Sequence, residues 1–189
     1  MTRLFLILLL LSAPALGATV AARLDLDTLT DNAVLVVRGK IESKEARWDA
    51  AQTGIWTHHA LKVSQTIKGD AQATLEFVTR GGVVGNRGQH VAGNGNFETG
   101  EEYVLFLWRD DDKRLQLVGM VQGALKVSEE NGVTRARNSF AGLSLVDPKT
   151  LKALPEGERQ PLDLEVGELA RRVAERVKAN EPAKAEGAK

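Results

Sequence analysis

Three histidines are the residues of this sequence best suited to metal or acid–base chemistry. His58 and His59 are adjacent, and His90 lies in a glycine-rich segment. Adjacent side chains on a β-strand point to opposite faces, so His58 and His59 would not share one ion in a strand. The sequence has no His-Glu-x-x-His motif and no cysteine. It therefore predicts no metal site and no cofactor.

Motifs for nucleophilic attack and for phosphate binding are incomplete. The segment Gly142-Leu143-Ser144-Leu145-Val146 lacks the closing glycine of a nucleophile elbow, so Ser144 is interpreted as structural. The segment Gly93-Asn94-Gly95 starts like a dinucleotide fingerprint, but Glu98 occupies the place of the third glycine. No Gly-Lys-Ser/Thr phosphate loop follows it.

The carboxylates do not form an obvious catalytic pair either. Glu101-Glu102 and Asp110 to Asp112 have the spacing of turn and strand-edge charges rather than of an opposed acid and base. No catalytic residue is assigned, which favours a protein that is not an enzyme. A metal-dependent or other hydrolase using His58 or His90 with nearby carboxylates is kept as the alternative function.

Residue types that dominate binding interfaces are found near the glycine-rich segment. We expect Trp56, His58, Arg87 and His90 to be the binding residues, since tryptophan offers a large apolar face and arginine a bidentate fork. The segment itself, residues 81–100, contains seven glycines and three asparagines. Irregular connections of this length are often functional, although a plain surface loop is the alternative.

Six short β-prone runs separated by Gly, Asn and Asp clusters precede the C-terminal part of the chain. The strands are expected at residues 34–41, 56–67, 75–79, 103–108, 115–118 and 124–127. Gly39 in the middle of the first run predicts a bulge or bend. The spacing, with no helical period between the runs, predicts a mainly β barrel or sandwich over residues 18–160.

The C-terminal part has a helical pattern. Apolar residues recur at helical spacing from Val166 to Val177, with Asp163 as a possible N-cap, and predict an amphipathic helix over residues 161–178. Residues 179–189 are small, charged or proline and are expected to be a disordered tail.

The N-terminus has the order of a secretory signal. Arg3 supplies a positive charge, an apolar run follows from Leu4 to Leu11, and small residues end at Gly17, after which we expect cleavage. The apolar stretch is too short for a membrane span, so no permanent membrane anchor is expected. The protein is therefore predicted to be exported, and periplasmic or extracellular.

Charge excludes one further class. The chain has 25 basic and 25 acidic residues, and only Arg3 lies in the predicted signal, which leaves 24 against 25. A domain with a net charge of about −1 lacks the electrostatic footprint of a nucleic-acid binder. Its 189 residues are enough for one domain with a sizeable core.

Three ordered segments resemble the netrin-like, or tissue-inhibitor-of-metalloproteinases-like, barrel of the OB type. They are Val36–Ile41, Leu61–Gly69 and Phe97–Leu107, and the resemblance covers about residues 33–107. It implies a closed or partly open antiparallel β-barrel that binds proteins. The cysteine clamp of the metalloproteinase inhibitors is not implied here, because this chain has no cysteine.

Two glycine-containing segments resemble an uncharacterised group of exported bacterial proteins. These are Gly82–Gly95 and Val118–Gly123. Some relatives in that group carry metalloprotease domains, but this sequence has no zinc-binding helix motif. The function expected from the sequence is a secreted or periplasmic, non-enzymatic binding module for a protein or cell-envelope partner. A structural envelope protein is a second alternative, and no oligomeric state is indicated.

Overall fold

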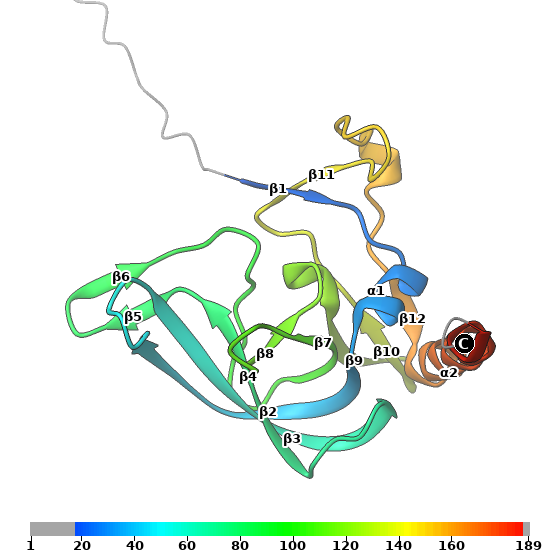
Figure 1. The fold of residues 1–189 in the computed structure, drawn as a ribbon, viewed down its shortest axis with the longest axis horizontal. Coiled ribbons are helices and arrows are strands. Elements are labelled where there is room, and N and C mark those ends of the chain that lie inside the picture. The colour runs from blue at the N-terminus through cyan, green and yellow to red at the C-terminus, as the bar shows by residue number, and fades with distance from the viewer. Residues whose placement is uncertain (1–17, 187–189) are drawn as a thin grey trace, which may run out of the picture.

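A computed structural model describes residues 18–186 of the chain. The predicted signal peptide, residues 1–17, lies outside the described residues, and so do residues 187–189. The chain is mainly β, with a long helix at its C-terminal end (Figure 1). This confirms the predicted class.

An eight-stranded antiparallel sheet forms the body of the protein, and all six predicted strands belong to it. Its hydrogen-bonded order is β12-β10-β9-β7-β2-β3-β4, and β8 also pairs with β7. The bounds are β2 (Leu35–Trp48), β3 (Ile55–Lys68), β4 (Thr74–Arg80), β7 (Glu102–Arg109), β8 (Leu115–Leu117), β9 (Ala124–Glu130), β10 (Val133–Arg137) and β12 (Asp163–Glu165).

The sheet curls but does not close into a barrel. Its ends, β4 and β12, do not pair with each other within residues 18–186. β8 lies against β4 on the curled side, without a hydrogen-bonded ladder between them. Of the predicted closed or partly open barrel, the closed form is therefore not found in the described chain.

The remaining elements are short, apart from the C-terminal helix. They are β1 (Thr19–Ala22), α1 (Leu26–Asn32), β5 (Gly82–Val84), β6 (Arg87–Gln89), η1 (Met120–Gly123), β11 (Leu143–Val146), η2 (Glu156–Glu158) and α2 (Val166–Glu186). β1 pairs in parallel with β11, and β5 pairs with β6. No helix within residues 18–186 is long and apolar enough to cross a membrane.

The first part of the predicted loop, residues 81–100, is a hairpin rather than an irregular connection. Val84 is opposite Arg87, so Gly85 and Asn86 form a two-residue turn, with Gly85 at a φ of 60°. Glycine and asparagine are the residues that such hairpin turns favour. This turn was not predicted from the sequence, because a segment so rich in glycine is also typical of irregular structure.

β2 and β7 are buried on both faces and separate two hydrophobic cores. Val36 and Phe106 point into one core and Leu35 and Leu105 into the other, and both runs are therefore continuously apolar. The first core lies beneath the two helices and comprises Leu26, Leu29, Ala33, Val36, Val104, Phe106, Val118, Leu125, Ala136, Val166, Leu169 and Val173. The second lies inside the curl and comprises Leu35, Val37, Ile41, Leu61, Phe77, Phe97, Tyr103, Leu105, Leu107, Leu115, Leu117 and Ala124.

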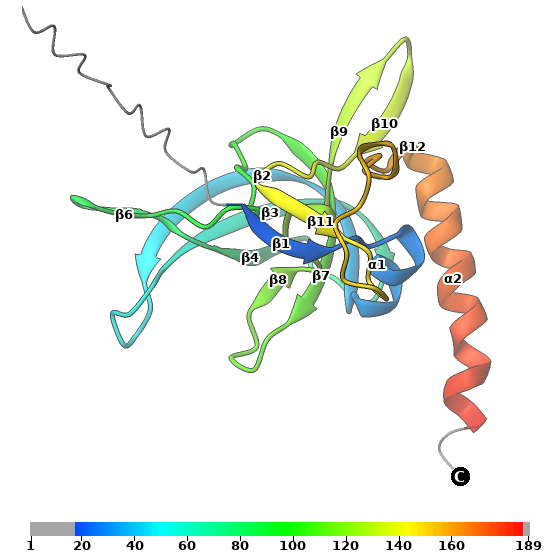
Figure 2. The same ribbon diagram turned by 90° about the horizontal axis from the view of Figure 1, so that it is seen from above.

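Bulges bend β2 where it crosses the body. The β2–β3 register shifts between Arg38 and Gly39 and again between Ile41 and Ser43. A Cβ on Gly39 would lie 2.5 Å from the carbonyl oxygen of Lys62, so only glycine permits this approach. The prediction of a bulge at Gly39 is confirmed. Beyond it, the paired β2 and β3 curve away from the rest of the sheet (Figure 2).

The C-terminal helix begins later and ends later than predicted. Asp163 is not its N-cap, because residues 163–165 pair with β10 as β12 and the Asp163 carboxylate accepts a hydrogen bond from Arg135. Val166, Leu169 and Val173 are buried, as their spacing predicts. The helix runs to Glu186 and so includes most of the segment expected to be disordered. Alanine, lysine and glutamate, which favour helices, dominate residues 183–186.

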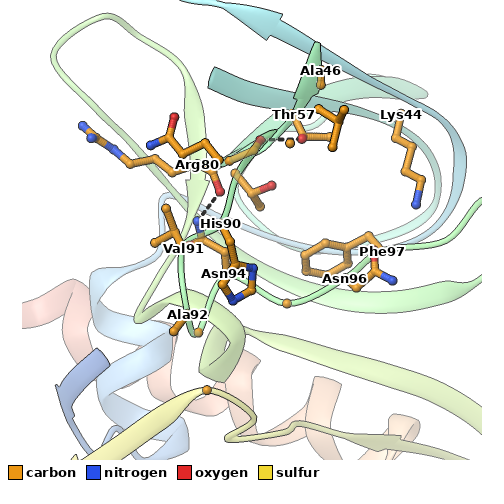
Figure 3. A pocket seen from close by; sticks show the side chains of 18 of the residues that line it. Lys44, Ala46, Thr57, Arg80, His90, Val91, Ala92, Asn94, Asn96 and Phe97 are labelled. Atoms are coloured by element: carbon orange, nitrogen blue, oxygen red, sulfur yellow. Dashed lines mark hydrogen bonds between the residues drawn. The ribbon is translucent and has the colours of Figure 1, made fainter. Parts of the chain in front are cut away.

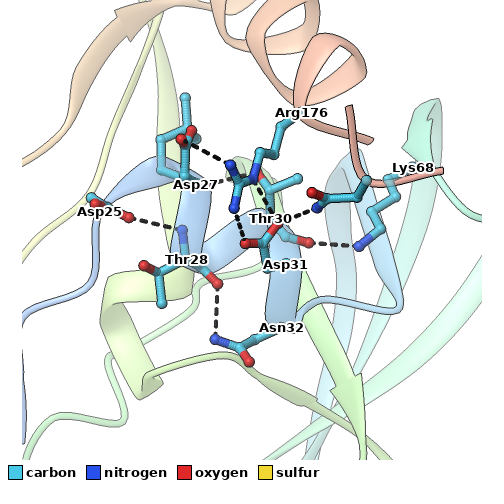
Figure 4. Close-up of polar contacts among 10 residues, drawn as sticks. Asp25, Asp27, Thr28, Thr30, Asp31, Asn32, Lys68 and Arg176 are labelled. Carbon is cyan, nitrogen blue, oxygen red and sulfur yellow. Dashed lines mark hydrogen bonds and ion pairs between the residues drawn. The ribbon is translucent and has the colours of Figure 1, made fainter. Parts of the chain in front are cut away.

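Charged side chains dock α2 against α1 (Figure 4). Arg176 donates from Nε and Nη2 to the two carboxylate oxygens of Asp31, at 2.8 and 2.5 Å, and its Nη1 lies 3.7 Å from Asp27. The hydrogen bonds from Arg176 hold the pKa of Asp31 below its usual value. The Lys68 ammonium donates to the carbonyl oxygens of Thr30 and Ala33 at the end of α1.

We expect Arg176→Ala to lower the free energy of unfolding only slightly, because both partners are partly exposed and solvent screens the pair. Urea unfolding at low salt measures this loss. Repeating it at about 1 M salt, where charges are screened within about 3 Å, should shrink the difference. A large loss of stability that persists in salt would contradict this assignment and indicate packing by the arginine stem.

Candidate functional site

A pocket of about 990 Å³ lies between the curved β2–β3 arm and residues 88–97 (Figure 3). β2 contributes Lys44 and Ala46 to its lining, and β3 contributes Thr57 and His59. β4, the start of the β5–β6 hairpin, and residues 141–142 complete the wall. The glycine- and asparagine-rich segment singled out in the sequence therefore forms one side of a concave site.

The pocket wall is fixed in place rather than left as a free loop. The Asn94 side-chain amide donates to the Arg80 carbonyl oxygen at 2.6 Å, and the Val121 amide donates to the Gly93 carbonyl oxygen at 2.9 Å. Gly93 has a φ of 86°, and a Cβ there would lie 2.2 Å from Leu143 Cδ2. Because Gly93 has no side chain, this segment can pack closely against Leu143 and hold a defined shape.

His59 is a buried, neutral histidine in the lining of the pocket. It is 3% exposed, its ring stacks on Phe77 with centroids 4.7 Å apart, and Phe97 packs edge-on at 5.2 Å. Burial lowers the pKa of His59 to about 4, and the charges of Lys44 and His58 add to this effect. The imidazole is therefore uncharged at neutral pH.

One ring nitrogen of His59 has no hydrogen-bond partner. Nε2 lies 3.0 Å from the Thr79 hydroxyl oxygen, whereas Nδ1 is buried and unpaired within the described chain. If Nε2 donates to Thr79, Nδ1 is an unused acceptor; if Thr79 donates to Nε2, Nδ1 carries an unused proton. An unmet group of this kind costs about 1–3 kcal/mol and marks a place where an added partner atom would be favourable.

The interior of the pocket carries little net charge. Among the described residues that line it there is no aspartate or glutamate. The Lys44 ammonium is bound at 2.7 Å by Glu98, whose pKa this hydrogen bond lowers. The Arg80 guanidinium lies over the Trp56 ring at 4.7 Å, away from the pocket (Figure 3). The hollow thus offers hydroxyls, amides and apolar surface.

Trp56, predicted as a binding residue, is buried. It is 6% exposed, with the guanidinium groups of Arg80 at 4.7 Å and Arg114 at 4.2 Å from its ring centroid. Asp110 orients Arg114 by accepting from its Nε at 2.8 Å. The tip of the β7–β8 hairpin therefore covers the tryptophan, and the contact helps to fill the seam between β8 and β4.

The structure does not bring the other three expected binding residues together. His90 is exposed and lines the pocket. His58 lies outside the pocket lining and has its Nδ1 2.8 Å from a carboxylate oxygen of Glu76. Arg87 is exposed on β6 and also lies outside the lining. These assignments remain predictions.

Sequence reasoning missed His59 as a site residue, along with Thr79 and Phe97. Alternation along β3 did place His59 on the same face as Leu61, and that face is buried. The sequence feature that could have indicated a site is an imidazole on an otherwise apolar strand face. That Nδ1 of His59 lacks a hydrogen-bond partner depends on the positions of β4 and of the segment before β7, which no local sequence pattern predicts.

No group of three or more His, Asp or Glu side chains in residues 18–186 is arranged to hold a metal ion. The sequence also matches no protein-family model and no curated protein. The function is therefore argued from the geometry of the pocket.

Proposed function

We propose that this protein is a secreted or periplasmic, non-enzymatic binding module that holds part of a protein or cell-envelope partner in the pocket beside residues 88–97. The observation that carries the proposal is a 990 Å³ hollow whose glycine-rich wall is hydrogen-bonded in place. Concave, mostly apolar sites with a few directed polar groups are typical of binding pockets. The unpaired Nδ1 of His59 adds a polar group for which a hydrogen bond with a bound ligand would be favourable.

A netrin-like or OB-type fold is part of this proposal. A strongly bent, bulged β2, a curled antiparallel sheet and a β8 strand that approaches β4 support the assignment. Barrels of the OB type bind ligands on a strand face and its adjoining loops, and this pocket is likewise lined by strands and a loop segment.

A hydrolase is the alternative that one contact favours. His58 and Glu76 form an imidazole–carboxylate pair at 2.8 Å, the spacing that a general base and its orienting group require. The pair lies outside the pocket lining, and the 53% exposed Glu76 side chain indicates a solvated pair. Stoichiometric zinc in the purified protein would favour the hydrolase.

The binding module is tested by blocking the pocket at an exposed lining residue. Ala141→Trp places a large ring at the pocket, and Val133→Trp places the same ring on β10, outside the pocket. Immobilised wild-type protein and the Val133→Trp control should enrich the same component from a cell-envelope extract. Ala141→Trp should lose most of that enrichment, as read by mass spectrometry.

Equal enrichment by the wild type and by Ala141→Trp would contradict the pocket as the binding site. No enrichment by any of the three proteins would favour the structural envelope protein. Thermal melts of all three proteins show whether the substitutions leave the fold intact.

A further inference from the structure

One edge of the main sheet is open beside the pocket. β7 pairs with β2 from Leu35 to Lys40, and the last contacts on that side are made by Ile41 with Gly100 and Glu101. From residue 42 to the end of β2 at Trp48, only β3 lies alongside as a paired strand in the described chain. Figure 2 shows this arm curving outward from the body.

The register shows which backbone groups face the open side. The Asp49 amide donates to the Gly54 carbonyl oxygen, and hydrogen-bonded pairs then recur at every second residue of an antiparallel ladder. The N–H and C=O groups of residues 43, 45 and 47 therefore point to β3. Those of residues 44, 46 and 48 point outward, and no hydrogen bond to another described residue uses them.

The open edge and the pocket are continuous. Lys44 and Ala46, whose backbone groups face outward, also have side chains in the pocket lining. The segment before β7 makes its last backbone hydrogen bonds to β2 at Gly100 and Glu101. Glu98, just before them, is bound to Lys44 by its side chain. A segment lying along this edge would therefore pass the mouth of the pocket.

We propose that the partner binds as an extended peptide that adds a strand to the β2 edge at residues 44–48 and places alternate side chains in the pocket. This rests on the proposed binding function and specifies its partner. Three successive outward N–H and C=O pairs, repeating every second residue, match another extended backbone and match neither a lipid nor a sugar.

The pocket sets the chemistry of the side chains that enter it. Its lining has no carboxylate in the described chain, and its lysine is already neutralised by Glu98. A charged side chain entering it would lose hydration without gaining an opposite charge. The entering residues are therefore apolar or uncharged polar.

A proline at position 46 tests strand addition directly. The Ala46 N–H is not part of the β2–β3 ladder, so Ala46→Pro removes an outward donor and leaves the internal pairing, as edge strands tolerate. Ala46→Ser keeps the N–H and is the matched control. The probe is a random peptide library displayed on phage and selected against the wild-type protein.

Selected peptides should bind Ala46→Pro about tenfold more weakly than wild type, given the loss of a backbone hydrogen bond and the added ring. They should bind Ala46→Ser more tightly than Ala46→Pro, because serine keeps the outward N–H. Binding of N-methylated peptides to the wild-type protein gives a second readout that needs no variant to fold. Methylation should weaken binding at every second peptide residue and be tolerated between them.

Peptides that bind Ala46→Pro as well as wild type, or that show no alternation on N-methylation, would overturn strand addition. So would a library from which no peptide is selected. An envelope component that is lost with Ala141→Trp but retained with Ala46→Pro would leave the proposed binding function standing and remove only this mode of binding.

Discussion

Replacing Phe97 by alanine should lower the free energy of unfolding by about 3–5 kcal/mol, which is the cost of removing a buried phenylalanine from a packed core. Phe97 is 2% exposed. Its ring contacts His59, Phe77 and Tyr103 edge-on, with centroids 5.2, 5.5 and 5.1 Å away. Phe97 precedes β7 and packs the segment around residue 97 onto the sheet. Its removal therefore takes packing contacts away from this segment and from the sheet.

Urea unfolding followed by tryptophan fluorescence measures this loss. Phe97→Leu is the control, because leucine fills most of the volume and should cost less than half as much. A loss below about 1 kcal/mol for Phe97→Ala would mean that the aromatic cluster is not packed as described. Because Phe97 also lines the pocket, the leucine variant should reduce partner capture even where it folds stably.

Acidification should destabilise the protein through His59. The pKa of His59 is about 4 in the folded state, against an ordinary value of 6.5. His59 therefore becomes protonated below pH 6.5 in the unfolded chain, but only below about pH 4 in the folded protein. Stability from this residue is complete above pH 6.5 and is lost progressively down to pH 4, by about 3 kcal/mol in all.

The measurement compares wild type with His59→Phe, which keeps an aromatic ring on Phe77 and does not titrate. Between about pH 7 and about pH 4.5 the wild type should lose about 2–3 kcal/mol more than His59→Phe. Equal losses in wild type and His59→Phe would show that His59 is protonated in the folded protein.

Carboxylates add a second acid-sensitive contribution at lower pH. Hydrogen bonds from Lys126 and Tyr103 lower the pKa of Glu101 to about 2. Its contribution is therefore present above its ordinary pKa of 4.5 and is lost as the pH falls toward 2. Wild type and His59→Phe share this loss, so it cancels in their comparison.

The strands of the main sheet could be predicted because each follows a local pattern. Alternation along β3 identifies its buried face, and Gly39 marks the bulge of β2. α1 was missed because its seven residues are too few for a helical period to stand out. β12 was missed because Asp163 before an apolar period also fits a helix cap.

The site could be predicted only in part, because its walls come from distant segments. Residues 81–100 were expected to be functional, and part of that segment lines the pocket. Trp56 is predicted as a binding residue, but Arg114 on the β7–β8 hairpin covers its ring. A sequence pattern cannot show which later residue will cover an earlier one, and the open β2 edge likewise depends on where β7 stops pairing.

The pairing of the first strand with a late one has a consequence for how the chain reaches its native state. Thr19–Ala22 pairs with Leu143–Val146, and α1 shares its core with residues of α2. During synthesis β1 has no pairing strand until residues 143–146 have been made. Contacts this distant in sequence slow folding, so β1 should acquire protection from hydrogen exchange late in refolding, after the β2–β3 hairpin.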